Sequence, residues 1–464
     1  MDTFDTIFTF LLTIVSFITR TWCIHHPKNV VFDEVHFGNF TNWYTKSEFY
    51  YDIHPPLGKL IMYLFAKLSE YKGDISFSGS YIYKQDDYIQ LRIIPAFFSS
   101  LCGPLIYLAV RFGDFSHISA IIAACMIIFD TSSAVEGHFI LSDGLLHFFC
   151  CLHIAIAFYT YNLKNGKRYL LFHVLNGLSL GAACSCKNTA WGLMGFDAFM
   201  YIIRISNLAG KFDIFESIFE VFIYGITLFL IQFFVYCLSF YIHFIILPFS
   251  GQGKPYLPND MKAQLIENNN ADLWGKRLKG KGLLYRTLKL TWKMHTGNMG
   301  IRGFHPSQSR PFNWPLLTGI DVSFWHSGKE SIKCHGNVFS YYLALIGIIV
   351  VLFSFNSKRY FDMIHSVIGW IFCYFPLYLI PRTLFLYHYL IPLIFGCISY
   401  GISLDLIHNK MIKRIVFIIS LCLVIFGFWL WMPFVYGMYI HDKKYMIWNQ
   451  NWLNGDSAFK KAKK

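Results

Sequence analysis

The sequence predicts an all-α membrane protein that crosses the bilayer about eleven times. Apolar runs of about 17–25 residues, the length that spans a bilayer, recur along the chain. Of its 464 residues, 55% are hydrophobic and only 14% are charged, whereas a soluble domain carries roughly 25% charged residues. The mean hydropathy is +0.43. Loops that hold many basic residues also alternate with loops that hold few, as expected of a polytopic protein.

The predicted spans follow one another from the N-terminus. They cover residues 4–22, 88–110, 116–133, 138–161, 169–186, 189–203, 216–247, 338–355, 361–380, 384–407 and 413–437. The first run lacks the basic segment and the small-residue cleavage site of a signal peptide, so we expect it to be a retained span. The 12 cysteines lie mostly inside apolar runs, where we expect packing thiols and no disulfide framework.

The short loops between spans predict the orientation of the chain. Two of the basic residues, Lys187 and Arg382, lie in one set of loops, and the alternate loops hold eleven: Arg111, Lys164, Lys167, Arg168, Arg204, Lys211, Lys358, Arg359, Lys410, Lys413 and Arg414. Because the loops richer in Lys and Arg face the cytoplasm, we expect a cytoplasmic N-terminus and a C-terminus on the opposite, luminal side.

Two longer segments, 23–87 and 248–337, then fall on the luminal side. We expect four regions: 1–247 with the loop 23–87, the loop domain 248–337, a second membrane region 338–437, and a luminal basic tail 438–464. The net charge of +13 is dispersed, and no nucleic-acid-binding module is visible, so we expect no nucleic-acid partner.

Segment 23–87 contains the most informative polar motif. Asp33 and Glu34 are adjacent within Phe32–Phe37, and Asp52-Ile53-His54-Pro55-Pro56 follows closely. Ionisable groups at a membrane boundary are costly and therefore indicate function. A carboxylate there can serve as a general base, and the two prolines hold the backbone before them extended. We therefore expect this loop to carry a catalytic site, with Asp52 and His54 in support.

These residues resemble the protein O-mannosyltransferase family. The resemblance runs in order through most of the chain, at Val31-Phe32-Asp33-Glu34-Val35-His36-Phe37, Asp52-Ile53-His54-Pro55-Pro56, Phe139-Ile140-Leu141-Ser142-Asp143, Tyr241-Ile242-His243-Phe244, Ser309-Arg310-Pro311 with Trp314-Pro315-Leu316-Leu317, and Leu384-Phe385-Leu386-Tyr387-His388-Tyr389-Leu390. It implies the GT-C glycosyltransferase architecture and mannose transfer, with inversion, from dolichyl phosphate mannose to Ser or Thr of proteins.

Two departures from the family accompany the resemblance. Eukaryotic members usually carry a β-trefoil MIR domain of nearly two hundred residues after the seventh span. Here only about 90 residues, 248–337, fill that gap, so we expect a short form without it. The family also usually has Arg where this chain has His138, which replaces a permanent charge by a titratable group.

The resemblance implies roles for single residues. It identifies Asp33 as the base, and Glu34 is expected to position the acceptor or support Asp33. For the lipid phosphate we expect Arg92, at the start of the second span, together with Lys187 and Arg382, which oppose the charge bias of the loops. Asp143 can pair with one of these cations, whereas Arg310 matches a family motif without an assigned chemical step. No metal or other cofactor is expected.

Location and partners also follow from the resemblance. We expect a multi-pass protein of the endoplasmic reticulum membrane, in contact with membrane lipids, that forms a homodimer or a heterodimer with a paralogue. Alternatives are a GT-C enzyme using another polyprenyl-phosphate sugar or a glycolipid acceptor, a non-catalytic partner subunit of a mannosyltransferase dimer, and a transporter or flippase. A transporter predicts internal repeats and paired broken helices, which the sequence does not show.

Overall fold

The computed structural model describes the chain except residues 1, 80, 210–213, 267–281 and 453–464. The α-helices are α1 (Thr3–Thr21), α2 (Glu34–Thr45), α3 (Leu57–Leu68), α4 (Asp87–Ser100), α5 (Cys102–Phe112), α6 (His117–Ile128), α7 (Thr131–His138), α8 (Asp143–Tyr161), α9 (Lys167–Cys186), α10 (Gly192–Ala209), α11 (Ile214–Ile246), α12 (Asn259–Lys262), α13 (Leu283–Met299), α14 (Val338–Leu352), α15 (Tyr360–Tyr374), α16 (Leu390–Ser403) and α17 (Lys410–Tyr436). Strands β1 (Val322–Ser327) and β2 (Glu330–Cys334) form an antiparallel hairpin. The all-α prediction is confirmed.

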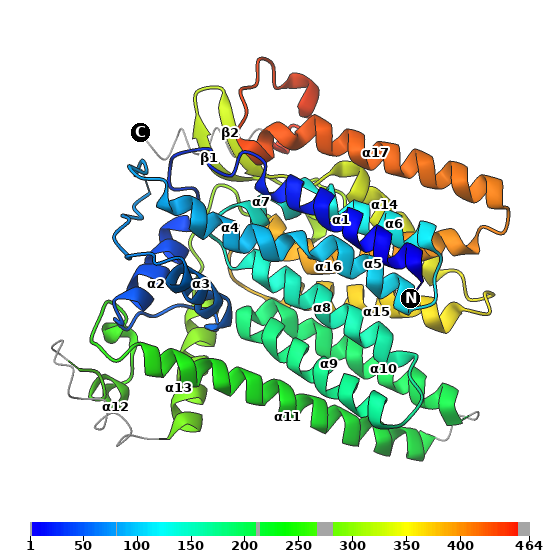
Figure 1. The fold of residues 1–464 in the computed structure, drawn as a ribbon, viewed down its shortest axis with the longest axis horizontal. Coiled ribbons are helices and arrows are strands. Elements are labelled where there is room, and N and C mark those ends of the chain that lie inside the picture. The colour runs from blue at the N-terminus through cyan, green and yellow to red at the C-terminus, as the bar shows by residue number, and fades with distance from the viewer. Residues whose placement is uncertain (1, 80, 210–213, 267–281, 453–464) are drawn as a thin grey trace.

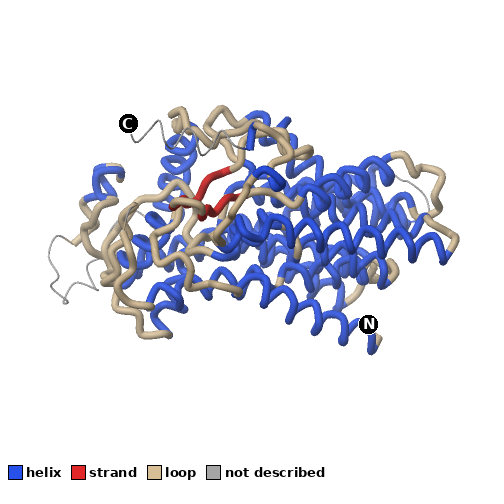
Figure 2. Tube along the Cα trace, turned by 90° about the horizontal axis from the view of Figure 1, so that it is seen from above, coloured by secondary structure: helices blue, strands red, loops and turns tan. Residues whose placement is uncertain are grey.

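The long helices lie side by side in one bundle (Figure 1). The shorter helices α2, α3, α12 and α13 gather at the end of the bundle that is opposite the N-terminus. Seen from above, many of the connecting segments collect at that same end (Figure 2). We call it the loop end. Segments 23–87 and 248–337, which the sequence predicts to be luminal, contribute α2, α3, α12 and α13 to it.

Eight helical segments among the described residues are long and apolar enough to cross a membrane. Helices α6 and α7 form a ninth only as a pair bent by 56°. Asp130 stabilises this break. Its carboxylate caps α7 by accepting a hydrogen bond from the backbone N–H of Ser133 (2.7 Å), and it accepts another from the backbone N–H of Asn337 (3.0 Å). Helix α14 is apolar but shorter. Each predicted span overlaps a helix, while the number eleven stays a prediction.

The prediction divided the chain wrongly around residues 131–138. It ended one span at 133 and began the next at 138, but α7 occupies this whole stretch and α8 begins only at Asp143. The apolar run ends at Phe129, and the buried Asp130 with the polar residues 131–133 follows it, but hydropathy alone does not show that a new helix begins there.

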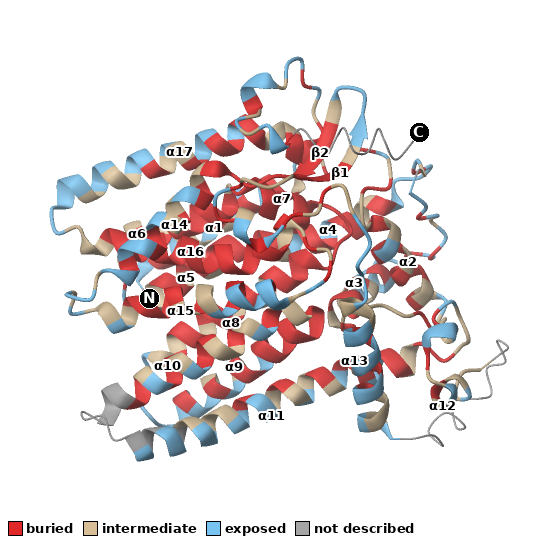
Figure 3. Ribbon diagram, turned by 180° about the vertical axis from the view of Figure 1, so that it is seen from behind, coloured by how far each residue is buried: buried red, intermediate tan, exposed pale blue. Residues whose placement is uncertain are grey.

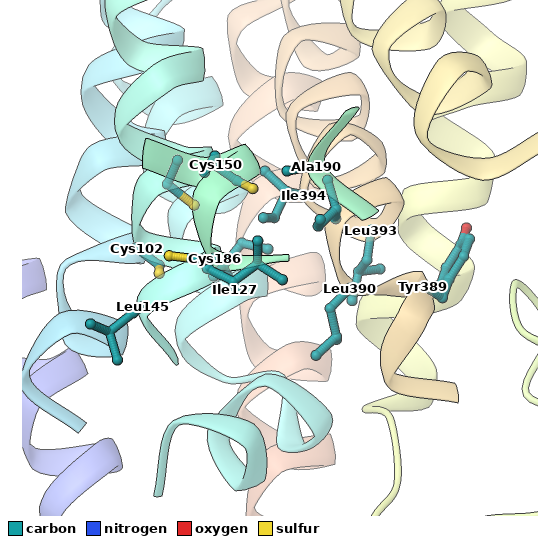
Figure 4. Close-up of a cluster of buried hydrophobic side chains, with 14 of the residues drawn as sticks. Cys102, Ile127, Leu145, Cys150, Cys186, Ala190, Tyr389, Leu390, Leu393 and Ile394 are labelled. Carbon is teal, nitrogen blue, oxygen red and sulfur yellow. The ribbon is translucent and has the colours of Figure 1, made fainter. Parts of the chain in front are cut away.

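The core lies where α5, α6, α8 and α16 meet, and Figure 4 shows apolar side chains from these helices packed together. Small residues bring the helices close: a Cβ on Gly347 of α14 would lie 2.2 Å from the Tyr400 backbone nitrogen of α16, a contact typical of membrane bundles. Nine of the 12 cysteines are buried, as expected of packing thiols.

The outer faces of α11 and α17 remain exposed (Figure 3). They present large apolar side chains to the surroundings, among them Phe222, Leu230, Phe234, Ile418, Ile419 and Trp429. In water such a surface would be unfavourable. In a bilayer it contacts the lipid chains, which are as apolar as the side chains themselves. The arrangement is that of a membrane protein whose interior is closely packed.

Candidate active site

A cavity of about 640 Å³ opens among the segments of the loop end. Residues from widely separated parts of the chain line it. Its polar lining includes Asp33, His36, Asp52, His54, Glu136, Asp143, Lys187, Gln252, His305, Arg382 and Thr383 with tyrosines 50, 51, 256 and 387. We call it the loop-end cavity. Six of the nine site residues predicted from the sequence line it. The three that do not are Glu34, Arg92 and Arg310.

Asp33 is held at the cavity by an unusual backbone conformation. The preceding residue, Phe32, has a φ of +47°, a left-handed value that L-residues rarely adopt and that costs of order 1–3 kcal/mol. Packing compensates for this cost, because the Phe32 ring stacks on Phe324 of β1 at 4.2 Å between ring centroids. The strained residue turns the chain into α2, so that Asp33 comes directly before the helix.

The Asp33 carboxylate makes no hydrogen bond or ion pair with another described residue. Burial raises its pKa to about 6, an effect that His36 and Lys187 oppose and that Asp143 and Asp52 reinforce. A carboxylate without partners and with a pKa close to neutral can accept a proton from a molecule in the cavity. Asp33 therefore has the properties of a general base.

Glu34 points away from the cavity, although it is the next residue. Its side chain is fully buried and forms a two-fold ion pair with Arg92, at 2.7 Å and 2.9 Å. It also accepts hydrogen bonds from the Val31 amide (2.8 Å), the Tyr83 hydroxyl (3.1 Å) and the Ile140 amide (3.1 Å). These five bonds join the loop before α2 to α4 and to the segment between α7 and α8. Glu34 supports Asp33 by holding its loop.

Arg92 has no N–H group left for a ligand. Besides its two bonds to Glu34 it donates to three backbone carbonyls, those of Ile24 (3.1 Å), Pro27 (3.0 Å) and Asn29 (3.0 Å). A guanidinium has five N–H donors, and all five are occupied. The structure therefore does not bring Arg92 to the cavity, and its predicted contact with a phosphate has no geometric support.

Lys187 and Arg382 both line the cavity. Lys187 follows α9, where its Nζ lies 2.9 Å from an Asp143 oxygen and 5.2 Å from the centre of the Tyr387 ring. The pairing of Asp143 with a cation is thus confirmed. Arg382 donates to His388 Nε2 at 3.0 Å and to the side chain of Asn298. Among the described residues, Lys187 uses one N–H of three and Arg382 two of five, so both cations retain donors for an anion.

Asp52 and His54 are fixed by a residue that sequence reasoning did not single out, Lys59. Lys59 forms a buried ion pair with Asp52 and donates to the His54 carbonyl at 2.8 Å. Burial, followed by Lys187 and Lys59, lowers the pKa of His54 well below its usual value, so the imidazole is neutral near pH 7. Its Nδ1 is buried without a partner among the described residues.

Glu136 is a second residue that sequence reasoning missed. It lies in α7, lines the cavity and is only 2% exposed. The available signal was an acid in the short connection between two predicted spans, since ionisable groups at a membrane by default suggest function. Two other motif residues lie elsewhere: Arg310 is exposed and outside the lining, and His138 is buried, with its Nδ1 3.0 Å from the Arg20 carbonyl oxygen.

The geometry brings together one carboxylate suited to accept a proton and two cations suited to hold an anion. Aromatic side chains, among them Phe40, Trp43, Tyr50, Tyr51 and Tyr256, form another part of the lining. Groups of this kind can activate a hydroxyl and stabilise a leaving phosphate. The cavity thus fits a group transfer in which a hydroxyl displaces a phosphate.

Solved structures with the same fold define the class. The Saccharomyces cerevisiae protein O-mannosyltransferase Pmt1–Pmt2 complex bound to the sugar donor superposes with a TM-score of 0.87 at 18% identity, over 97% of this chain and 93% of that one. The archaeal oligosaccharyltransferase AglB from Archaeoglobus fulgidus reaches 0.55 at 12% identity, over 96% and 57%. The fold is that of the GT-C membrane glycosyltransferases.

Sequence comparison then identifies the family. The model of the family described as "Dolichyl-phosphate-mannose-protein mannosyltransferase" matches residues 10–248, and that of its C-terminal four-span region matches residues 283–455. The chain belongs to this family. Dolichyl-phosphate-mannose–protein mannosyltransferase 3 of S. cerevisiae is 34% identical over 263 residues, which are 55% of this chain. The aligned part spans only about a third of that relative, 35% of its length.

Proposed function

We propose that this protein transfers mannose from dolichyl phosphate mannose to Ser or Thr hydroxyls of proteins. Its family membership supports this assignment of donor and acceptor. The observation that carries the proposal is the loop-end cavity itself. There the carboxylate of Asp33 has no partner in the described part of the chain, while Lys187 and Arg382 keep N–H donors for a phosphate.

In the proposed reaction Asp33 takes the proton of the acceptor hydroxyl. The hydroxyl oxygen then attacks C1 of the mannosyl group, and the bond between C1 and the phosphate oxygen breaks. The electron pair of that bond remains on dolichyl phosphate, whose charge Lys187 and Arg382 stabilise. Attack from the side opposite the phosphate inverts the configuration at C1.

Asp143 and Glu34 have supporting roles in this proposal. Asp143 orients Lys187 through their 2.9 Å contact and leaves two of its N–H groups for the phosphate. Glu34 and Arg92 hold the loop that carries Asp33, and Lys59 with Asp52 holds the backbone of His54. Arg310 is given no part in the reaction.

We further propose that the loop end faces the lumen of the endoplasmic reticulum, with the N-terminus cytoplasmic and the C-terminus luminal. The asymmetry of basic residues between the short loops supports this orientation. The donor then reaches the cavity from the surrounding lipid. The solved relative is a complex of Pmt1 and Pmt2, which supports a dimer, either with a second copy of this chain or with a paralogue.

The function can be tested with purified protein in lipid vesicles. Radiolabelled dolichyl phosphate mannose and a Ser/Thr-rich peptide should give a labelled peptide whose mannose is released by an α-mannosidase. A parallel reaction with dolichyl phosphate glucose tests the donor, and a glycolipid replaces the peptide in a third. Transfer only from the glucosyl donor, or only to the glycolipid, would contradict the proposal and favour another GT-C activity.

A further inference from the structure

Glu136 is a buried carboxylate in the cavity that the proposed reaction does not use. Its side chain is 2% exposed, and Oε1 has no hydrogen-bond partner among the described residues. Asp143, Lys187 and Asp33 are the charged groups that act on it most strongly. The one cation among these, Lys187, is already paired with Asp143. Cys334 makes a hydrogen bond with the Glu136 side chain, but Oε1 keeps a hydrogen-bonding capacity that the described residues do not satisfy.

The backbone around Glu136 is fixed. A Cβ on the next residue, Gly137, would lie 2.2 Å from Ser99 Oγ, so α7 packs against α4 without space between them. His138 is held by the Arg20 carbonyl at 3.0 Å, and Asp130 caps the start of α7. Because the helix cannot shift, it cannot carry the carboxylate toward another partner. Its position at the cavity is a fixed feature of the fold.

An unsatisfied acceptor in this position is costly unless a ligand supplies a donor. A shared cation does not fit this site. In the described part of the chain, the carboxylate oxygens of Asp33, Glu136 and Asp143 do not all lie within 4.8 Å of one another, as the ligands of one metal ion would. A sugar fits, because each of its hydroxyl groups offers an O–H donor without adding charge. The mannosyl group must also lie between the base Asp33 and the phosphate at Lys187, which are two of the groups next to Glu136.

We propose that Glu136 accepts a hydrogen bond from a hydroxyl group of the donor's mannosyl residue and so selects and positions the sugar. This inference rests on the proposed function and goes beyond it, because it assigns a sugar-binding group that is neither the base nor a phosphate ligand. Losing a hydrogen bond so that a buried polar group is left without its partner lowers binding on the order of 10- to 100-fold.

The test asks whether the loss of the Glu136 carboxyl and the loss of one mannose hydroxyl have the same effect on kcat/KM. Glu136→Ala, Glu136→Gln and the unaltered protein are compared with dolichyl phosphate mannose and with its 2-, 3-, 4- and 6-deoxy analogues. For one analogue, kcat/KM of the unaltered protein should fall about 10- to 100-fold. Glu136→Ala should show a similar loss with the natural donor and no additional loss with that analogue. Asp74→Ala, an exposed acid outside the cavity, should behave like the unaltered protein.

Glu136→Gln keeps the shape and an acceptor oxygen, so it should fold and retain a weaker discrimination against the same analogue. This variant serves even if Glu136→Ala does not accumulate. The inference is overturned if every deoxy analogue lowers kcat/KM of the variants by the same factor as it lowers kcat/KM of the unaltered protein. If the unaltered protein transfers no mannose at all, the proposed function fails and the inference with it, whereas transfer without coupling removes the inference alone.

Discussion

Replacing Arg92 by Met should destabilise the protein without changing its affinity for the lipid phosphate. The substitution leaves Glu34, which is fully buried, without its charged partner. Removing one partner of a buried ion pair typically costs about 3–5 kcal/mol. Glu34 keeps three of its five hydrogen bonds, those from Val31, Tyr83 and Ile140, so we expect a loss near the lower limit, about 3 kcal/mol.

Denaturant titration in mixed micelles measures this loss, and initial rates at varied donor concentration give the donor KM of the remaining active protein. The double variant Glu34→Gln with Arg92→Met should recover part of the stability, because it removes the unpaired buried charge. Arg414→Met, an exposed arginine far from the loop end, serves as the control. A stable Arg92→Met protein with a strongly raised donor KM would refute the reasoning and make Arg92 a phosphate ligand.

Three further predictions follow from the site and the charge pattern. First, kcat/KM should rise with pH through about 6 and level off above it, because the pKa of Asp33 is raised to about 6 and only the deprotonated carboxylate acts as base; a pH profile that is flat between 5 and 7 would speak against it. Secondly, Lys187→Gln or Arg382→Gln should raise the donor KM on the order of 10-fold or more, since charged hydrogen bonds are lost, while the KM of the acceptor peptide stays the same; unchanged donor kinetics in both would exclude a phosphate site. Thirdly, glycosylation acceptors inserted near Asn259 should be modified in microsomes and those near Asn165 should not; the reverse pattern would place the cavity on the cytoplasmic side.

The sequence predicted the fold class well, because the signals for it are local. An apolar run long enough to span a bilayer shows itself in a single segment of sequence, and each of the predicted runs overlaps a helix. The boundary at α7 was missed because the bend depends on one buried side chain, Asp130, and on its contact with Asn337, more than two hundred residues away. Such a contact leaves no periodic trace in either segment.

The site was predicted only in part, for the same reason. Asp33, Lys187 and Arg382 stood out as charges in places where membrane topology disfavours them, and all three line the cavity. The partnership of Glu34 with Arg92 could not be read from the sequence, because adjacency to Asp33 says nothing about the direction in which a side chain points. Once the loop folds, neighbouring acids face opposite ways, one into the cavity and one into the protein.

The central claim is that Asp33 is the base that activates the acceptor, and Asp33→Asn tests it most directly. The amide has the size and shape of the carboxylate but cannot take a proton. The measurement is the single-turnover rate of mannose transfer from dolichyl phosphate mannose with saturating peptide, with donor binding determined on the same preparation and Asp74→Asn as the control. We predict a rate lowered on the order of 100- to 10,000-fold with donor binding nearly unchanged. A transfer rate close to that of the unaltered protein would contradict the account.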